Sequence, residues 1–318
     1  MLPWLGGAGC SDGLWGNPSS VHRYGQAARE AVEAAREQVA RLIDCRTPAE
    51  IVFVSSGTEA NNAVVASRLG ECAPGDGFGV SALEHPSMLG AARAGAPRAG
   101  VVVDEVPPQE DGVMSASRMV AVAGPGTRLA ALMLANNELG TLQPVAELTA
   151  ALRERGVPVL CDAVQAVGKI AVSVHELGVD YLTLAAHKFH GPLGAAALWI
   201  RAGAAFSPLL VGGAQERQRR ASTVNVPAVV GFGKACALAA RDLPARHARL
   251  RRLRERFEAG LAAIPGARVH CAGAPRLPHT SHVAFPLLVG QELMIRLDIL
   301  GLAVSTAAAC GSGTVRAS

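Results

Sequence analysis

Only three lysines occur in this 318-residue sequence, against 27 arginines, so a reaction that needs a lysine amine has few candidates. Lys188 stands out because it follows residues 181–185, an apolar run that is typical of a buried strand. An amine at the end of a strand can condense with a carbonyl group to form a Schiff base. The alternative for any lysine is a solvated surface position, and that is the interpretation we give Lys169 and Lys234.

A carboxylate and a small polar turn could bind the other parts of a ligand. Asp162 ends the apolar run 157–161, and open α/β sheets bind ligands at the carboxyl ends of their strands. The turn Ser-Ser-Gly-Thr-Glu at 55–59 lies between a predicted strand and a predicted helix, where backbone N–H groups and the helix dipole attract anions. Taken alone, Asp162 could equally cap a helix, and the turn is more simply a Ser or Thr helix cap.

The turn, the aspartate and the lysine, taken together and in this order, suggest a pyridoxal-phosphate site. The turn would anchor the phosphate, Asp162 would keep the pyridine nitrogen protonated so that the ring accepts electrons, and Lys188 would carry the cofactor covalently. The pair His187 and His190 has a spacing that metal ligands also use. No cysteine or carboxylate accompanies that pair in the sequence, so we predict no metal site.

Five motifs make a more specific match. They follow one another as in the cysteine desulfurase and selenocysteine lyase family, and they occupy residues 16–22, 56–62, 135–140, 162–165 and 187–188. The sequence resembles this family over residues 16–314. The resemblance implies an α/β, aminotransferase-like (type I) pyridoxal-phosphate fold. It also implies removal of sulfur from cysteine, or of selenium from selenocysteine, which leaves alanine.

The resemblance further implies a role for individual residues. Cofactor contacts would come from Gly57 and Thr58 at the phosphate, His85 stacked on the ring, Asn137 and Gln165 near the phenolic oxygen, Asp162 at the ring nitrogen, His187 at the phosphate, Lys188 in the Schiff base, and Thr223 at the phosphate of the partner subunit. The catalytic residues would be Lys188, His85 and Cys310. A site that needs Thr223 from a second subunit implies a homodimer.

Cys310 matches the family's catalytic cysteine, which takes the sulfur as a persulfide and passes it to a sulfur-acceptor protein. Its small neighbours, such as Gly311, suit a thiol that must move between substrate and acceptor. For the other six cysteines we expect buried apolar positions. Ser222 replaces a glycine that is usual in the family and Ala185 replaces an occasional serine, so altered phosphate affinity is expected. Ala308, two residues before Cys310, is a further and minor departure, since the family commonly has glycine there.

The apolar pattern predicts the elements that must position these residues. Apolar side chains recur every three or four positions over 25–43, which predicts an amphipathic helix. Further helices are predicted at 58–69, 144–155 and 291–300. Buried strands are predicted at 51–54, 78–82, 101–106, 129–135, 157–161, 181–185 and 196–200. Strands of this kind separated by helices indicate a mostly parallel sheet covered on both faces.

A change in composition near residue 241 divides the sequence in two. Residues 1–242 are predicted to form a large cofactor-binding domain. Residues 243–318 are predicted to form a long connecting helix and a small, incomplete α/β domain that carries the Cys310 loop. Measured against the family, the chain is expected to begin late and to stop before an arginine that would bind the substrate carboxylate. Its turnover is therefore expected to be defective.

Composition excludes several other classes of protein. Half of the residues are hydrophobic and 18% are charged, which excludes a disordered chain, and a net charge of +4 is too small to indicate a nucleic-acid or membrane partner. The arginine-rich stretch 246–256 is expected to be a solvated helix face. Seven cysteines without a C-x-x-C pair favour a reducing, cytoplasmic setting. No uncharged stretch reaches the roughly 20 residues of a membrane span.

The alternative to an enzyme is a non-catalytic homologue that keeps the fold and the dimer surface.

Overall fold

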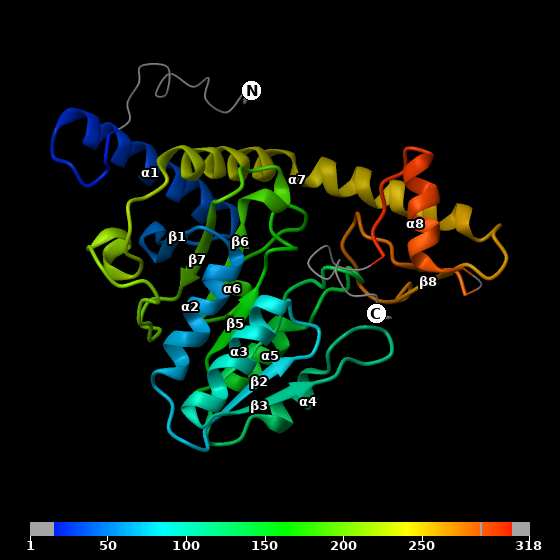
Figure 1. Cartoon of the computed structure of the whole chain (residues 1–318), viewed down its shortest axis with the longest axis horizontal. Helices are drawn as coiled ribbons and strands as arrows, with labels where there is room; N and C mark the ends of the chain where they lie inside the picture. Colours follow the sequence, from blue (N-terminus) through cyan, green and yellow to red (C-terminus); the bar gives the residue numbers. More distant parts are fainter. Residues whose placement is uncertain (1–15, 287, 307–318) are drawn as a thin grey trace.

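The computed structural model describes residues 16–286 and 288–306, and its centre is a sheet of seven strands within those residues (Figure 1). The strand order is β1-β7-β6-β5-β4-β2-β3. The strands are β1 (Ile51–Val54), β2 (Gly77–Ser81), β3 (Val102–Val106), β4 (Thr127–Ala131), β5 (Val159–Asp162), β6 (Tyr181–Ala185) and β7 (Ala196–Ile200).

The sheet is mostly parallel, as predicted, with one reversed strand. Each neighbouring pair from β3 to β6 is parallel, whereas β7 is antiparallel to both β6 and β1. The connection from Ala185 to Ala196 is too short for the crossover that a parallel strand needs, and it turns through positive φ at His190 and Gly194. Because β7 is reversed, β1 points the same way as β6. The carboxyl ends of β1, β2, β4, β5 and β6 therefore meet at one edge.

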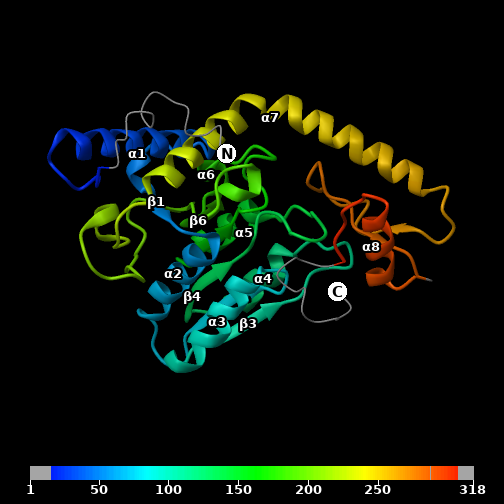
Figure 2. The same ribbon diagram turned by 45° about the horizontal axis from the view of Figure 1, so that its top comes forward.

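Helices cover both faces of the sheet (Figures 1 and 2). One face packs against α2 (Gly57–Leu69) and α3 (Pro86–Ala99), around a core that includes Val64, Phe78 and Met88. The other face packs against a second core with side chains from α1, α4, α5, α6 and α7. Those helices are α1 (Arg23–Leu42), α4 (Ala116–Val122), α5 (Val145–Arg153), α6 (Val174–Leu177) and α7 (Val226–Leu261). Three short 3₁₀ helices complete this part: η2 (Pro48–Glu50), η3 (Ala186–Phe189) and η4 (Gln215–Gln218).

Several predicted elements are confirmed, and two boundaries are wrong by more than two residues. β1, β6 and β7 occupy the residues predicted for them. β4 ends at Ala131 instead of continuing to residue 135, although the backbone N–H groups of Leu132 and Leu134 still donate to β5, at Leu160 and Asp162. The long helix begins at Val226, not near 243, since its first turns bury Phe232 and Cys236 against the core. The predicted domain boundary at 242 thus falls inside α7, and it stays a prediction.

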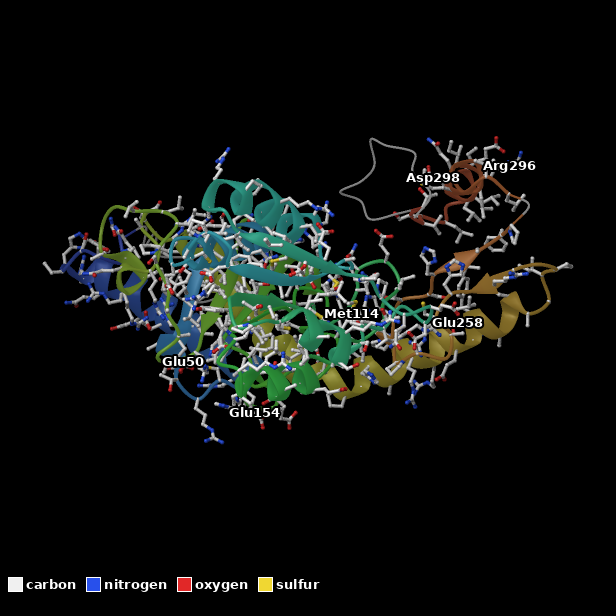
Figure 3. All side chains as sticks on the ribbon, turned by 90° about the horizontal axis from the view of Figure 1, so that it is seen from below. Glu50, Met114, Glu154, Glu258, Arg296 and Asp298 are labelled. Atoms are coloured by element: carbon white, nitrogen blue, oxygen red, sulfur yellow. The ribbon has the colours of Figure 1, made fainter. Side chains whose placement is uncertain are left out.

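Beyond the middle of α7 lies a smaller group of elements (Figure 2). β8 (Arg268–Val269) and β9 (Val283–Ala284) form an antiparallel pair, and α8 (Gly290–Ile299) follows them. Glu258 on α7 accepts hydrogen bonds from Arg276, at 2.8 and 3.0 Å, which ties this group to the helix. In Figure 3, Arg296 and Asp298 lie on α8, apart from Glu258. No helix in the described residues is long and apolar enough to cross a membrane.

A buried ion pair fixes β1 relative to the loop before α7. Arg36 of α1 is 2% exposed, and its guanidinium donates two hydrogen bonds to Glu216, at 2.8 and 2.9 Å. The Glu216 carboxylate also accepts the backbone N–H of Phe53 in β1. Arg36 donates in addition to the carbonyl of Ile51. The paired charges satisfy each other and the backbone, so the loop that leads to Thr223 is held against β1.

Candidate active site

Asp162 lies at the carboxyl end of the central strand β5, as predicted, and it is 5% exposed. Each of its carboxylate oxygens accepts one hydrogen bond. Oδ1 accepts the backbone N–H of Val164 at 3.0 Å, and Oδ2 accepts an amide hydrogen of Asn61, from α2, at 2.8 Å. These charge-assisted bonds hold an ionised carboxylate at the edge where the parallel strands end.

The first turn of α2 begins three residues after β1. Ser56 is its N-cap and accepts the backbone N–H of Glu59 at 3.0 Å. The turn lies against the segment after β5, since a Cβ on Gly57 would come 3.0 Å from Cγ2 of Val164. Thr58 is exposed. N–H groups of a first helical turn have no partner inside the helix and carry the positive end of its dipole, so this turn can bind an anion beside Asp162.

Glu59 connects this turn to the loop that carries Thr223. Its carboxylate accepts hydrogen bonds from the backbone N–H and hydroxyl of Ser55, and from the guanidinium of Arg220 at 2.8 Å. Burial alone would raise the pKa of Glu59, but the bonds from Arg220 and Ser55 outweigh it and lower the pKa. Thr223 is exposed, three residues beyond Arg220. Sequence reasoning missed both Glu59 and Arg220.

Ser222 adopts φ 91°, in the left-handed region that favours glycine. A serine in that conformation is strained at a cost of about 1–3 kcal/mol. The serine that stands here in place of the family's usual glycine therefore strains the backbone directly before Thr223.

Lys188 and His187 lie on η3, immediately after β6, and both side chains are exposed. Burial, and then the charges of Lys188 and Lys169, lower the pKa of His187. Because the charges of both lysines act on His187, Lys169 must lie near Lys188. The sequence did not predict this second lysine.

Lys169 is not the surface lysine that we expected. It is half-buried, and its ammonium donates a 2.9 Å hydrogen bond to Oε1 of Gln165. Burial, and then the charge of Lys188, lower the pKa of Lys169 to about 8. The cause is a close packing of two loops, because a Cβ on Gly168 would come 2.8 Å from the side chain of Phe189. Gly168 therefore lets the segment after β5 pack closely against η3. Lys234, by contrast, is exposed as expected.

His85 caps the start of α3, on the same edge. Its Nδ1 accepts the backbone N–H of Ser87 at 3.1 Å. Asn61 donates to Ser87 as well as to Asp162, so His85 and Asp162 belong to one group of polar side chains. Asn61 and Ser87 were not singled out from the sequence.

Glu84 is buried beside Asp162. Its Oε1 accepts the backbone N–H of Met133 at 2.6 Å, and within the described residues its Oε2 has no hydrogen-bond partner. Burial, and then the charge of Asp162, raise the pKa of Glu84 to about 8. Glu84 is therefore protonated at neutral pH, which lets one carboxylate charge remain on Asp162.

Replacing Glu84 by glutamine is expected to change how stability depends on pH. A carboxyl whose pKa rises on folding, here from 4.5 to about 8, stabilises the fold fully below the lower value and stops doing so as the pH rises through the upper one. Glutamine cannot ionise and keeps an acceptor for Met133. Between pH 6 and 8 the free energy of unfolding of the unaltered protein should fall relative to Glu84→Gln by about 2 kcal/mol. Urea unfolding at both pH values measures this, and a difference that is the same at pH 6 and 8 would contradict it.

A cleft of about 540 Å³ opens next to Asn137, between the loop that carries this residue, α7 and the segments 279–282 and 303–306. Its wall includes Arg254 and Phe257 of α7, His279, and Thr306 near the end of the described residues. Burial, and then the charges of Lys169 and Arg254, lower the pKa of His279 to about 4, so its ring is neutral at physiological pH. The cleft thus reaches from the neighbourhood of Lys169 to the segment that precedes Cys310.

The five cysteines in the described residues are poor nucleophiles in this structure. Burial is the main cause that raises the pKa of each thiol, to about 11 for Cys45, well above the usual range for Cys161, and in the same direction for Cys72, Cys236 and Cys271. Cys161, Cys236 and Cys45 are buried, as expected, whereas Cys72 and Cys271 are only half-buried. Cys310 lies outside the described residues.

The donor set at this edge fits one kind of cofactor. A helix start suits a phosphate, a buried carboxylate suits a protonated ring nitrogen, and a lysine amine suits an aldehyde. The Oδ1 atom of Asn61 is buried next to Asp162 and has no partner in the described residues, so one hydrogen-bond acceptor is still available at that point. A phosphorylated pyridine aldehyde carries all the matching groups. In the described residues, no group of three or more potential metal-ligating side chains occurs.

Comparison with known proteins agrees with this geometry. The sequence model of the aminotransferase class-V family matches residues 11–318. A cysteine desulfurase of Cereibacter sphaeroides is 41% identical over 319 aligned residues, which span 100% of this chain and 80% of the relative. A solved structure described as a NifS-like protein has a TM-score of 0.88 at 34% identity, over 93% of this chain and 81% of that one. Another, described as SspA in complex with cysteine, has a TM-score of 0.80 at 27% identity, over 94% and 83%.

Proposed function

This chain belongs to the aminotransferase class-V family, and within it to the cysteine desulfurases, which are pyridoxal-phosphate enzymes; on that premise we propose that its own Lys188, Asp162 and Cys310 carry out the desulfuration of L-cysteine. The observation that supports this most strongly is the placement of Asp162. It is a buried carboxylate at the end of β5, with the start of α2 on one side and η3 with Lys188 following the neighbouring strand β6.

The cofactor would be held by residues that the fold brings to the same edge. Gly57, Thr58 and His187 would contact the phosphate, and Asp162 the ring nitrogen. Gln165 would contact the phenolic oxygen together with Asn137, and its amide oxygen already accepts a hydrogen bond from Lys169. That bond turns the NH₂ group of Gln165 away from Lys169, so the amide can act as a donor. His85 would stack on the ring, and Lys188 would bind the cofactor covalently.

The remaining chemistry belongs to the thiol of Cys310. Pyridoxal phosphate, when bound, supplies an acceptor for the electron pair left on carbon when a carbon–sulfur bond breaks. The thiolate of Cys310 would attack the sulfur of the substrate, so a sulfur–sulfur bond forms as the carbon–sulfur bond breaks. His85, beside the ring, would move protons to and from the reacting substrate. The products are alanine and a persulfide on Cys310, which a sulfur-acceptor protein would then take up.

A homodimer would complete this site. The exposed Thr223 would reach the phosphate bound by the other subunit, and the Glu59–Arg220 ion pair would fix the loop from which it extends. The reducing setting inferred from the cysteine content would place this reaction in the cytoplasm.

Changing Asp162 to asparagine is expected to weaken both cofactor binding and turnover. Both oxygens of Asp162 accept hydrogen bonds, so an asparagine must turn its NH₂ group against the N–H of Val164 or against the amide of Asn61. The ring nitrogen would also lose its charged partner. Together these losses should reduce kcat by on the order of 10²-fold, since a hydrogen bond to a charged group contributes about 1.5–3 kcal/mol.

Alanine production from cysteine and titration of the cofactor's visible absorbance measure these two effects. The chain with Asp180→Asn, a carboxylate at the opposite end of the sheet, is the matched control, because it too loses a buried carboxylate charge. If Asp162→Asn turns over at the rate of the unaltered chain, Asp162 does not support the ring.

A further inference from the structure

The polar group around Asp162 contains two side chains to which no role has been given. Asn61, on α2, is fully buried, and it donates hydrogen bonds to Oδ2 of Asp162 at 2.8 Å and to Oγ of Ser87 at 3.0 Å. Ser87, in the first turn of α3, makes a 2.8 Å contact with Nδ1 of His85. The two helices lie side by side over one face of the sheet (Figures 1 and 2), which is what allows this connection. The carboxylate under the proposed ring and the histidine above it are thus joined through Asn61 and Ser87.

The carboxylate determines the orientation of the Asn61 amide. If the amide were reversed, its oxygen would face the negative charge of Asp162, which repels an acceptor. The nitrogen must therefore face Asp162, and one amide hydrogen serves Asp162 while the other serves Ser87. This orientation leaves Oδ1 of Asn61 buried without a partner in the described residues, a cost that the charge-assisted bond to Asp162 must outweigh.

The orientation of Asn61 leaves the hydroxyl proton of Ser87 free for the next bond. Oγ of Ser87 receives a hydrogen from Asn61, so its own hydroxyl proton is available for Nδ1 of His85. The backbone N–H of Ser87 points to the same ring nitrogen, at 3.1 Å. An imidazole nitrogen that accepts a hydrogen bond uses its single lone pair to do so and carries no proton. The proton of a neutral His85 ring must then reside on Nε2, at the opposite edge of the imidazole.

We propose that Asn61 and Ser87 are positioning residues that hold the His85 imidazole as its Nε2–H tautomer and in register with Asp162. The catalytic importance of this tautomer rests on the proposed function. A histidine beside the cofactor would move protons through the ring nitrogen whose protonation is fixed. Neither Asn61 nor Ser87 has to touch the cofactor or the substrate. Their effect is to connect the group on one face of the ring with the group on the other.

The tautomer can be measured without cofactor or substrate, by NMR of protein labelled with ¹⁵N-histidine. The His85→Gln variant assigns the signal by its absence. In the unaltered chain, Nε2 of His85 should have the chemical shift of a protonated nitrogen and Nδ1 that of an unprotonated one. Ser87→Ala removes the 2.8 Å hydroxyl contact and leaves only the 3.1 Å bond from the backbone N–H, so the share of the Nδ1–H tautomer should rise, and Ser87→Thr, which keeps the hydroxyl, should restore the original share. Ser115→Ala, which removes another helix-capping serine, should leave the His85 signals unchanged.

A double-mutant cycle tests whether Asn61 and Ser87 act as one connection. Asn61→Ala and Ser87→Ala should each reduce kcat about tenfold with little change in KM, and the double variant should lose about tenfold instead of a hundredfold. An Nδ1–H tautomer in the unaltered chain, or an unchanged tautomer in Ser87→Ala, would overturn the proposal. Losses that multiply in the double variant would overturn the single connection. Because the NMR experiment uses the cofactor-free chain, a failure of the proposed enzyme activity would not be mistaken for a failure of this assignment.

Discussion

Replacing Lys188 by alanine is expected to abolish covalent attachment of pyridoxal phosphate and to reduce alanine production from cysteine by on the order of 10⁴-fold or more. Lys188 follows β6, the strand next to β5 and Asp162, so we expect its amine to form the bond to an aldehyde whose ring nitrogen faces Asp162. The helix start at Gly57 and the carboxylate of Asp162 do not depend on this lysine. Noncovalent binding should therefore survive in weakened form, which ultrafiltration with free cofactor would detect.

Borohydride reduction followed by peptide mapping locates the covalent bond directly. The pyridoxyl group should be found on Lys188 in the unaltered chain. Lys169 is the informative alternative, because its pKa is lowered to about 8 and a larger part of it is the reactive neutral amine. Its ammonium is nevertheless engaged with Gln165, and it lies on the segment after β5, so we expect no label there. A label on Lys169 or Lys234 in the unaltered chain would contradict the assignment.

Replacing Cys310 by serine is expected to remove the persulfide and to reduce alanine production by on the order of 10⁴-fold or more. The reason is that a hydroxyl is a far weaker nucleophile toward sulfur than a thiolate. The other thiols in the described residues cannot substitute for it. Burial raises the pKa of each of them, so almost none is ionised at neutral pH. Persulfide labelling after addition of cysteine, with peptide mapping, should therefore mark Cys310.

The matched control is Cys271→Ser. Cys271 is a half-buried thiol, in the smaller group of elements beyond the middle of α7, with a raised pKa, so its loss should leave persulfide formation intact. Persulfide that persists at its usual level in Cys310→Ser would place the nucleophile elsewhere. Cys10, which also lies outside the described residues, would then be the next thiol to replace.

Local sequence was enough to predict the strands and the residues at their ends. The apolar runs at 157–161 and 181–185 are short and are followed by polar residues, so Asp162 and Lys188 could be placed at strand ends. The direction of β7 was not predictable in this way. Burial of residues 196–200 looks the same for a parallel and an antiparallel strand, and only the length of the connection from β6 distinguishes them.

Residues whose roles depend on contacts between distant segments were missed. Lys169 was interpreted as a surface residue because nothing near it in sequence buries it. Its environment comes from the packing of Gly168 against Phe189, about 20 residues later. Asn61 and Ser87 were overlooked for the same reason, since their meaning depends on α2 and α3 packing over the end of β5. The pattern of a buried polar residue on an otherwise apolar helix face is the one signal that could have identified Asn61.

The pairing of β1 with β7 has a consequence for how the chain is made. Ile51 pairs with Trp199, about 150 residues later, so a ribosome adding roughly 5–20 residues per second completes β1 about 7 to 30 seconds before its strand partner exists. Until then the apolar segment 51–54 has an unpaired edge and is open to chaperones or to aggregation. The turn at Gly57 is translated first among the proposed cofactor contacts, yet it gains its fixed place only after β7 has emerged. A nascent chain stalled before residue 196 should therefore be unable to capture the cofactor.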